Sequence, residues 1–478
     1  MNSTVNLLLK RLGIILLVVI AMSGSYYLGS SAHPSDDTFS EVFNKLYDDH
    51  YTQPSKDDLW QGAIDGMINS LDDPFTNYFD QESYEAFRQS QEESFVGIGV
   101  TVENVDEAVI IRSVFPSSPA EEAGLMAGDQ ITHVDDVDYR GRPFIEATSV
   151  LRGEAGSEVV IGYKRPGVET TLYVALTRED IANPTVTAEL VDDNIGVIYL
   201  HAFGTDTVNI FTSYIDAFEN DDNIEGLIID LRNNGGGDLN TLIDLLDIFL
   251  DKDAKSLPYF TLQTYDNRSM DIYDENGSNT DTKAYPISLI VNGQSASASE
   301  VFAAAMHQYG DYPVYGETTY GKGTLQQSIP LRSALGDHLH LTVGRWLTPE
   351  GDWVHYQGDT PGFEPSHPVT QSEYFTTPML FLQEDETYSF DMVDDTIAIA
   401  QTILNALGYT VRNDGYFNLA TQDALTLYQS QNGIAATGTL NDVTAAQLSE
   451  DLYTYRNALD NDLQFQAAYQ AMVALLDE

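Results

Sequence analysis

Apolar runs of strand length alternate with helix-like runs between residues 183 and 310. The run "EGLIIDLRNN" precedes "GGGDLNTLIDLLDIFL", and "PISLIVN" precedes "SEVFAAAMHQ". The first run of each pair is short and contains β-branched residues, as strands do. In the second run, apolar residues recur at helical spacing. Strands that alternate with helices pack as a sheet covered by helices. This stretch therefore predicts an α/β core.

The remaining chain divides into segments of different character. Residues 33–94 look helical and polar, and residues 95–180 carry short alternating runs separated by Gly, Pro and Asp turns, which predicts a β-rich module. The α/β core extends over residues 181–375. Helix-like patterns in residues 390–452 indicate a separate small domain, and residues 453–478 indicate a helical tail. The predicted fold class is a multidomain α/β protein.

The first 32 residues have the pattern of an export segment. Lys10 and Arg11 precede an apolar run that ends near Ala32. Two interpretations stay open: a signal peptide cleaved after Ala32, or a retained signal anchor with the positive residues inside the cell. Both predict export. The expected location is the cell membrane, with the main part outside the cell, or a secreted state if the segment is cleaved.

Composition excludes several functional classes. The chain has 74 acidic and 22 basic residues, a formal net charge of -52, which repels nucleic acid, so no nucleic-acid partner is expected. The absence of cysteine excludes thiol catalysis and zinc-thiolate sites. The sequence contains neither HExxH nor GxxxxGK[ST], and "GGGD" lacks the later glycine of a dinucleotide motif. We therefore expect neither a metal nor a cofactor.

Three serines at alternate positions connect an apolar run to a helix-like run. They are Ser295, Ser297 and Ser299 in "VNGQSASASE". A serine between a strand and a helix exposes its hydroxyl at the strand's carboxyl edge, beside backbone N–H groups able to bind an oxyanion. The alternative is structural, because Ser297 to Glu300 spells S-A-S-E, a helix capping box.

A nucleophilic serine needs a base, and two candidates follow it in the sequence. His307 lies within the body of the next helix, where packing decides its direction. Lys322 lies between glycines in "YGKGTLQQ". It would act as a base if burial lowered its pKa by roughly three units from about 10.4, a cost of about 4 kcal/mol for its charged form. A solvated surface lysine is the alternative.

The glycines of "LRNNGGGD" supply backbone amides without obstructing side chains. They follow an apolar strand and precede a helix. Gly235 to Gly237, together with the turn before Ala298, would form two halves of an oxyanion hole. A tight strand-to-helix turn is the alternative for any single glycine.

Taken together, the motifs resemble the C-terminal processing peptidases, also called tail-specific proteases. "VGIGV", "SPAEEAGLMAGDQI", "LRGEAGSEV", "LIIDLRNNGGG", "VNGQSASASE", "GETTYGKGTLQ" and "GRWLTPEGDW" match that family in order, over roughly residues 36–369. The resemblance implies a Ser/Lys serine protease with Ser297 as nucleophile, Lys322 as general base and Gln326 holding the lysine. It implies that the amides of Ala298 and Gly236 bind the oxyanion.

One residue departs from the family pattern, since relatives usually have proline where Gly235 stands. The substitution puts the rigidity of the loop in question.

The β-rich module resembles a PDZ domain, which captures a peptide C-terminus by adding it as a strand to a sheet edge. "FVGIGV" matches the carboxylate-binding loop, so Gly97, Ile98 and Gly99 are the implied contacts. Arg152 in "LRGEAG" matches a position that links the PDZ domain to the protease site in relatives. A plain hairpin is the alternative interpretation.

The small domain near the C-terminus resembles the three-helix peptidoglycan-binding module of cell-wall hydrolases, over about residues 391–452. A helical bundle without a ligand is the alternative. Relatives with the helical N-terminal segment tend to pair through it, which implies a homodimer. The expected partners are protein substrates with exposed apolar C-terminal tails, peptidoglycan and a membrane.

Two functions of different classes remain. The first is an exported serine endopeptidase that recognises C-terminal tails. The second is a non-catalytic adaptor that joins a PDZ domain to a peptidoglycan-binding domain. The paired Ser297 and Lys322 favour the first, because an adaptor has no need for them.

Overall fold

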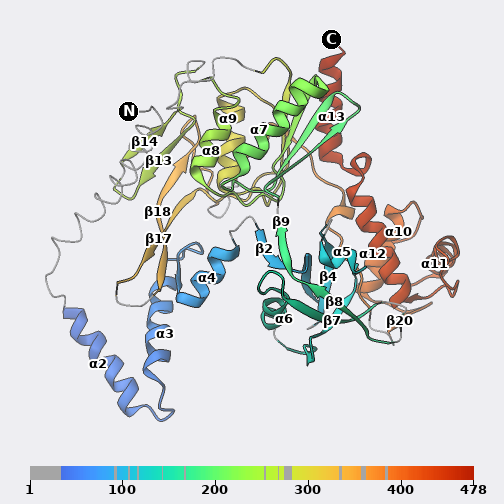
Figure 1. Ribbon diagram of the computed structural model, residues 1–478, viewed down its shortest axis with the longest axis horizontal. Coiled ribbons are helices and arrows are strands. Elements are labelled where there is room, and N and C mark those ends of the chain that lie inside the picture. The colour runs from blue at the N-terminus through green and yellow to red at the C-terminus, as the bar shows by residue number, and fades with distance from the viewer. Residues whose placement is uncertain are drawn as a thin grey trace. The chain divides into compact units, whose positions relative to one another are not determined.

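The computed structural model describes residues 34–477 apart from 91–93, 106–107, 116–117, 127, 143, 166–167, 169, 183, 252–254, 267, 274–282, 333–335, 357–361 and 383–385. The expected export segment, residues 1–32, lies outside the described residues. The chain separates into two compact units, residues 1–80 with 328–341, and residues 81–327 with 342–478 (Figure 1).

The first unit contains two helices and a small β pairing. Helices α2 (Pro34–Asp49) and α3 (Lys56–Asn69) contact each other through aromatic rings, with Phe43 and Trp60 at a centroid distance of 4.9 Å. Strand β1 (Asn77–Phe79) pairs antiparallel with residues 338–340, at the beginning of β18 (His338–Leu347). Apolar side chains remain exposed along both helices, which leaves this unit with a small core of its own.

The β-rich module follows α4 (Gln81–Ser90). Its five main strands have the order β3-β4-β5-β7-β8: β3 (Val100–Val105), β4 (Ala108–Val114), β5 (Gln130–Val134), β7 (Glu158–Lys164) and β8 (Leu172–Thr177). The short β6 (Val137–Asp138) pairs with β5, and the helices are α5 (Pro119–Glu122) and α6 (Phe144–Leu151). Entry and exit strands β2 (Ser94–Gly97) and β9 (Glu179–Ala182) pair antiparallel. The module has its own apolar core, as the alternating pattern predicts.

A six-stranded sheet forms the α/β core, in the order β10-β11-β12-β15-β16-β19. The strands are β10 (Val186–Val191), β11 (Ile195–Leu200), β12 (Gly226–Asp230), β15 (Ile287–Val291), β16 (Val314–Gly316) and β19 (His367–Pro368). Only β10 runs antiparallel to its neighbour. Every residue of β12 and β15 is buried, as expected for central parallel strands covered on both faces.

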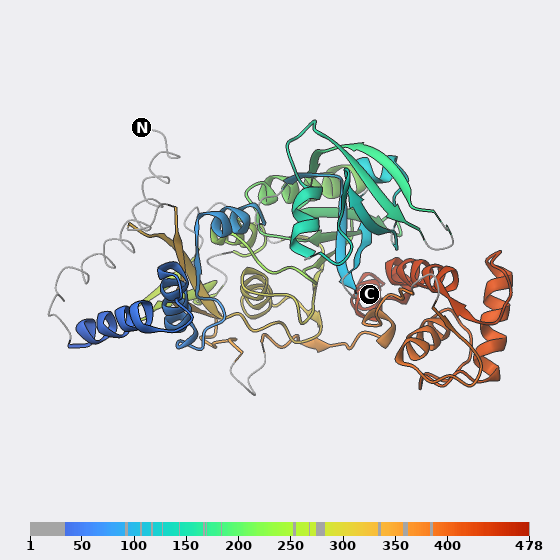
Figure 2. The same cartoon turned by 90° about the horizontal axis from the view of Figure 1, so that it is seen from below.

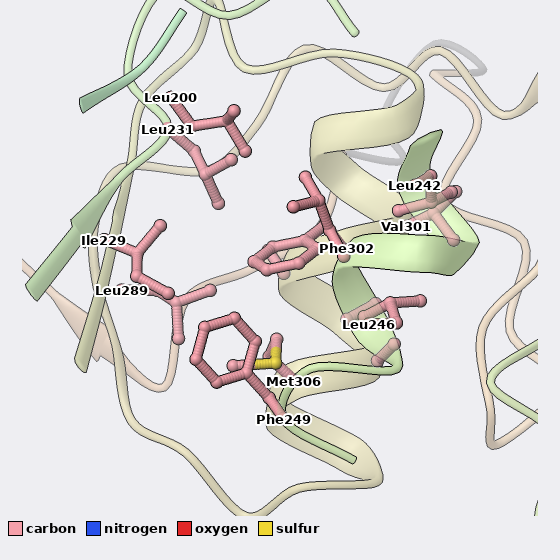
Figure 3. Close-up of a cluster of buried hydrophobic side chains, with 14 of the residues drawn as sticks. Leu200, Ile229, Leu231, Leu242, Leu246, Phe249, Leu289, Val301, Phe302 and Met306 are labelled. Atoms are coloured by element: carbon pink, nitrogen blue, oxygen red, sulfur yellow. The ribbon is translucent and has the colours of Figure 1, made fainter. Parts of the chain in front are cut away.

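Three helices cover one face of this sheet: α7 (Thr207–Ala217), α8 (Leu239–Leu246) and α9 (Ala298–Gln308). Figure 3 shows Phe302 and Met306 of α9 beside Phe249 and pointing towards Leu289 of the sheet. A second sheet contains β13 (Phe260–Thr264), β14 (Ser269–Ile272), β17 (Thr324–Pro330) and β18. Helix α9, which follows Ser297, packs on the six-stranded sheet, whereas β17, which follows Lys322, is a strand of the second sheet. The two candidate catalytic residues therefore precede elements of different sheets.

The C-terminal region forms a small domain and then returns to the core. The domain contains β20 (Thr387–Tyr388), α10 (Asp395–Ala406), α11 (Leu419–Gln431), β21 (Leu440–Asn441) and α12 (Asp442–Asn457) around its own apolar core (Figure 2). The short turns η2 (Glu373–Phe375) and η3 (Leu459–Asn461) flank the small domain. Tail helix α13 (Leu463–Leu476) follows η3. The π-helical turn η1 (Phe218–Asp222) extends α7.

Tail helix α13 covers the second face of the α/β sheet. Its side chains Phe465, Ala468 and Met472 share a buried cluster with Ile228 and Ile290. The spacing of three and four residues places these side chains on one helical face. The small domain is thus an insertion in sequence between the sheet and the helix that completes its cover.

An ion network holds the beginning of α13 to the sheet. Arg232, just after β12, donates to Asp230 at 2.6 Å and to Asp462 at 2.7 Å, and Asp462 caps α13. Both carboxylates are buried.

Among the helices within the described parts of the chain, none has the length and apolar content needed to cross a bilayer.

Candidate active site

Ser297 lies where the predicted pattern placed it, between the end of β15 and the first residue of α9. Its backbone has φ 57° and ψ −116°, a conformation that costs a non-glycine residue free energy. An ordinary helix cap has extended backbone angles, as Asp238 has before α8. Helix α9 does begin with the predicted capping box. The cap therefore exists, but at a strained serine, which is the arrangement found at functional sites.

The two neighbouring serines have structural roles. The Ser295 hydroxyl donates to the Leu231 carbonyl at 2.9 Å and accepts from the Asn292 N–H at 3.0 Å. The Ser299 hydroxyl donates to the Asn234 carbonyl at 2.9 Å. Both serines are buried, whereas Ser297 is partly exposed. Of the three, Ser297 is the one placed to meet a substrate.

The glycine-rich loop reaches the Ser297 turn through Gly236. A Cβ at Gly236 would lie 2.9 Å from the Ala298 nitrogen and 2.9 Å from the Ser297 Cβ, and φ at Gly236 is 102°. Only glycine allows this approach. The structure therefore brings together the two loops that the sequence analysis assigned to an oxyanion hole.

The hydrogen bonds of the two proposed oxyanion donors differ. The Gly236 N–H donates to Asn234 Oδ1 at 2.8 Å, so in the structure described this amide already has an acceptor. This bond is not visible in the sequence, because an Asn side chain that accepts from the residue two positions on looks like any loop asparagine. The Ala298 N–H donates to no other residue in the described ranges.

Three asparagines join the glycine-rich loop to the Ser297 turn: Asn234, and the pair Asn233 and Asn292. Asn234 is fully buried; its Nδ2 donates to the Leu200 carbonyl at 2.7 Å, and its carbonyl accepts from the Ala296 N–H at 2.9 Å. The Asn233 N–H donates to Asn292 Oδ1, and Asn292 Nδ2 donates to Asn233 Oδ1, both at 3.0 Å. These contacts fix the glycine loop against the Ser297 turn.

Lys322 lies in the turn between β16 and β17 and is partly buried. Its carbonyl accepts from Trp346 Nε1 at 2.9 Å. Gly323 leaves room for Trp353, since a Cβ there would lie 2.6 Å from Trp353 Nε1. Trp353 Nε1 also donates to the Gly323 carbonyl at 2.7 Å, so two tryptophan side chains hold the backbone of the lysine turn.

Gln326 lies on β17, four residues beyond Lys322. Its amide nitrogen donates to Thr324 Oγ1 at 2.8 Å and to Thr342 Oγ1 at 3.2 Å. These two donations orient the amide and leave its Oε1 as the acceptor atom. His307, the other candidate base, lies on α9 with Nδ1 at 2.9 Å from the Tyr312 carbonyl, a structural contact.

A buried carboxylate lies between the Ser297 turn and the Lys322 turn. Glu300 accepts four hydrogen bonds, at 2.6 to 2.8 Å, whose donors are Ser297 N, Thr319 Oγ1, Gly321 N and Lys322 N. Burial raises the pKa of the Glu300 carboxyl, and the four hydrogen bonds act in the opposite direction. In the sequence, Glu300 is recognisable only as part of a capping box.

The three residues implied in peptide binding lie at the end of β2 and in the two-residue link to β3. Gly97 ends β2 opposite Glu179, and Ile98 buries its side chain in the module's core. Gly99 has φ 83°, and a Cβ there would lie 2.2 Å from the Ser118 Cβ. The N–H groups of Ile98 and Gly99 donate to no other residue in the described ranges, which suits a carboxylate ligand. Arg152 is exposed in the turn after α6.

The site combines a strained serine, a lysine turn and a glycine loop on an α/β core, which defines the class of serine peptidases. Residues 194–365 match the model of peptidase family S41. Residues 96–176 match the PDZ domain, residues 394–448 the putative peptidoglycan binding domain, and residues 30–83 the activating protease CtpB N-terminal domain.

Two relatives of Bacillus subtilis (strain 168) extend the likeness to almost the whole chain. The carboxy-terminal processing protease CtpB is 33% identical over 440 residues, covering 91% of this chain and 88% of that protein. The protease CtpA is 33% identical over 460 residues and covers 95% of each. The chain therefore belongs to peptidase family S41 and is a carboxy-terminal processing serine protease with a PDZ domain.

A solved structure of the photosystem II D1 C-terminal processing protease is also similar. It is 25% identical, covers 71% of this chain and 94% of that one, and has a TM-score of 0.43.

Proposed function

We propose that the chain cleaves exported proteins by a Ser/Lys acyl-enzyme mechanism and selects them by their C-terminal tails. The observation that carries this proposal is the strained Ser297, held at the beginning of α9 beside the glycine loop and joined through Glu300 to the lysine turn. A strained serine held by several loops is expected of a nucleophile and is of no use to an adaptor.

The chemistry follows from the groups present. A neutral Lys322 amine removes the Ser297 proton as Oγ attacks the scissile carbonyl, and the ammonium then protonates the leaving amine. Water hydrolyses the acyl-enzyme in the second half of the reaction. Gln326 Oε1 accepts from the lysine amine and keeps it directed at Ser297, because the Gln326 nitrogen already donates to two threonines.

The oxyanion hole has one ready donor in this proposal, the Ala298 N–H. The Gly236 N–H contributes only where its bond to Asn234 Oδ1 is exchanged for one to the substrate. The test of the mechanism is hydrolysis of an unfolded protein with an apolar C-terminus by the chain from His33 onward, with Ser297 and Lys322 variants.

Location is the second part of the proposal: residues 1–32 hold the protein at the membrane, and residues 390–452 bind peptidoglycan. The small domain exposes the apolar side chains Phe390, Val393 and Leu419, which are available for contact with a ligand. We expect the full chain to fractionate with membranes and the chain from His33 onward to sediment with purified peptidoglycan. The paired substitutions Val393→Asp and Leu419→Asp should reduce the sedimented fraction severalfold. Unchanged sedimentation would leave the domain a bundle without this ligand contact.

Dimerisation through the first unit is the third part. Helices α2 and α3 expose Phe39, Val42, Trp60 and Met67, at 44% to 61% of their surface. A row of apolar side chains on two helices is a suitable interface for a second copy. Sedimentation of the chain from His33 onward should give the mass of two chains. Trp60→Glu should give one. Tyr265→Glu is the control, because Tyr265 of the other unit is also an exposed aromatic residue, and it should still give two. A single-chain mass for the unaltered protein would contradict the pairing.

A further inference from the structure

Glu300 has a place in the site that the proposed mechanism does not use. It lies in the first turn of α9, three residues after Ser297, and is fully buried. An ordinary capping-box glutamate accepts from its own cap residue alone. Glu300 also accepts from the turn of residues 319–322, which lies after β16, in a different part of the sequence.

The two carboxylate oxygens divide their four donors in an informative way. Oε2 accepts from the backbone N–H of Ser297 and from that of Lys322, both at 2.8 Å. One oxygen atom therefore connects the backbones of the nucleophile and the base. Oε1 accepts from the Gly321 N–H at 2.7 Å and the Thr319 hydroxyl at 2.6 Å.

Every hydrogen-bond partner of the Glu300 carboxyl is a donor, so none of these bonds needs a proton on the carboxyl. The Thr319 hydroxyl oxygen accepts from the Phe363 N–H at 2.7 Å, so its own proton is directed to Glu300. The other three donors are backbone amides. All four contacts thus need the carboxylate as acceptor, which is the condition under which a buried carboxylate is tolerated.

We propose that Glu300 is a positioning residue that sets the distance and orientation between Ser297 and Lys322. Ser297 and Lys322 lie on turns that belong to separate strand connections, after β15 and after β16. The bond to the Ser297 N–H also holds the strained backbone of the nucleophile. This inference rests on the proposed Ser/Lys function and adds the element that couples its two members.

The test is Glu300→Gln, which keeps the size of the side chain. In this variant an amide nitrogen replaces one of the two carboxylate oxygens. The nitrogen is a donor and faces the two donors that this oxygen had, so both hydrogen bonds are lost. We expect kcat to fall about 10²-fold, the loss that a displacement of about 1 Å causes, with KM within about threefold of the unaltered value. The rate of Ser297 labelling by a fluorophosphonate should fall in parallel.

A milder pair of variants decides the case if Glu300→Gln does not fold. Thr319→Ser keeps the hydroxyl that donates to Oε1, and Thr319→Val removes it at similar size. We expect Thr319→Ser to retain kcat within about twofold and Thr319→Val to lose about tenfold. Equal kcat for both variants would overturn the proposal.

Met306→Ala is the matched control for stability. Met306 lies on the same helix, buried in the core of Figure 3 and away from the two turns. Its truncation should lower Tm and leave kcat per folded molecule unchanged. If Glu300→Gln behaves like Met306→Ala, Glu300 is structural and the inference fails, even though Ser297→Ala is silent. If Ser297→Ala cuts like the unaltered chain, the proposed function itself fails.

Discussion

Ser297→Ala is expected to reduce proteolysis by roughly 10⁴-fold or more, to the level of an uncatalysed control, because the acyl-enzyme cannot form. Lys322→Ala should lose as much, since the two residues act as one unit and the double variant should lose no more. The measurement is cleavage of an unfolded protein with an apolar C-terminus by the chain from His33 onward. Thermal unfolding of each variant checks that it remains folded.

Lys322→Arg separates a base from a structural cation. Arginine keeps the positive charge and much of the side-chain length but does not lose a proton near neutral pH. We expect this variant to be as silent as Lys322→Ala. Activity within tenfold of the unaltered chain would show that Lys322 is not the base. Equal cutting by all variants would assign the activity to another residue or to a contaminant, and a folded, unaltered chain that binds tails without cutting them would support the adaptor.

Gly99→Ala is expected to remove tail selection. The added Cβ would lie 2.2 Å from the Ser118 Cβ and 2.6 Å from its hydroxyl, at a backbone angle of 83° that alanine rarely adopts. The loop must therefore move, and the N–H groups of Ile98 and Gly99 lose the arrangement that would hold a carboxylate. We expect kcat/KM for a tailed protein to fall about 10- to 100-fold.

Gly124→Ala is a matched control in the same module. Gly124 has a similar angle, 74°, but a Cβ there meets nothing within 4 Å. This variant carries the same kind of backbone strain without a collision and should retain tail selection. Equal losses in both variants would point to strain alone, and retained selection in Gly99→Ala would place the tail elsewhere. Loss of cleavage of a short tail-free peptide in Gly99→Ala would show that the module also activates the core.

Much of the architecture was predictable because it depends on local pattern. The strands β12 and β15 are short apolar runs bounded by Gly, Asn and Pro, and the helices that follow have helical periodicity, so the α/β core is confirmed. The match to PDZ and peptidoglycan-binding models likewise confirms the class of the flanking modules.

The fine structure of the site was less accessible, because it depends on contacts across long sequence separations. Gly236 illustrates this: its position beside Ser297 was expected, but its N–H bond to Asn234 was not. Glu300 was visible as a capping residue three positions from Ser297. Its bonds to Gly321 and Lys322 come from a turn more than twenty residues away, and no local pattern reports them.

The sequence by itself determined which segments become strands and helices, and which serine, lysine and glycines stand at their ends, because hydrophobic period and turn residues act over a few positions. Only the tertiary structure decided that α13 returns past the small domain to cover the sheet, and that Glu300 joins the turns of Ser297 and Lys322. A buried sheet needs cover on both faces, and a buried carboxylate needs several donors. The residues that meet these two requirements are distant in sequence, so only the folded chain shows which they are.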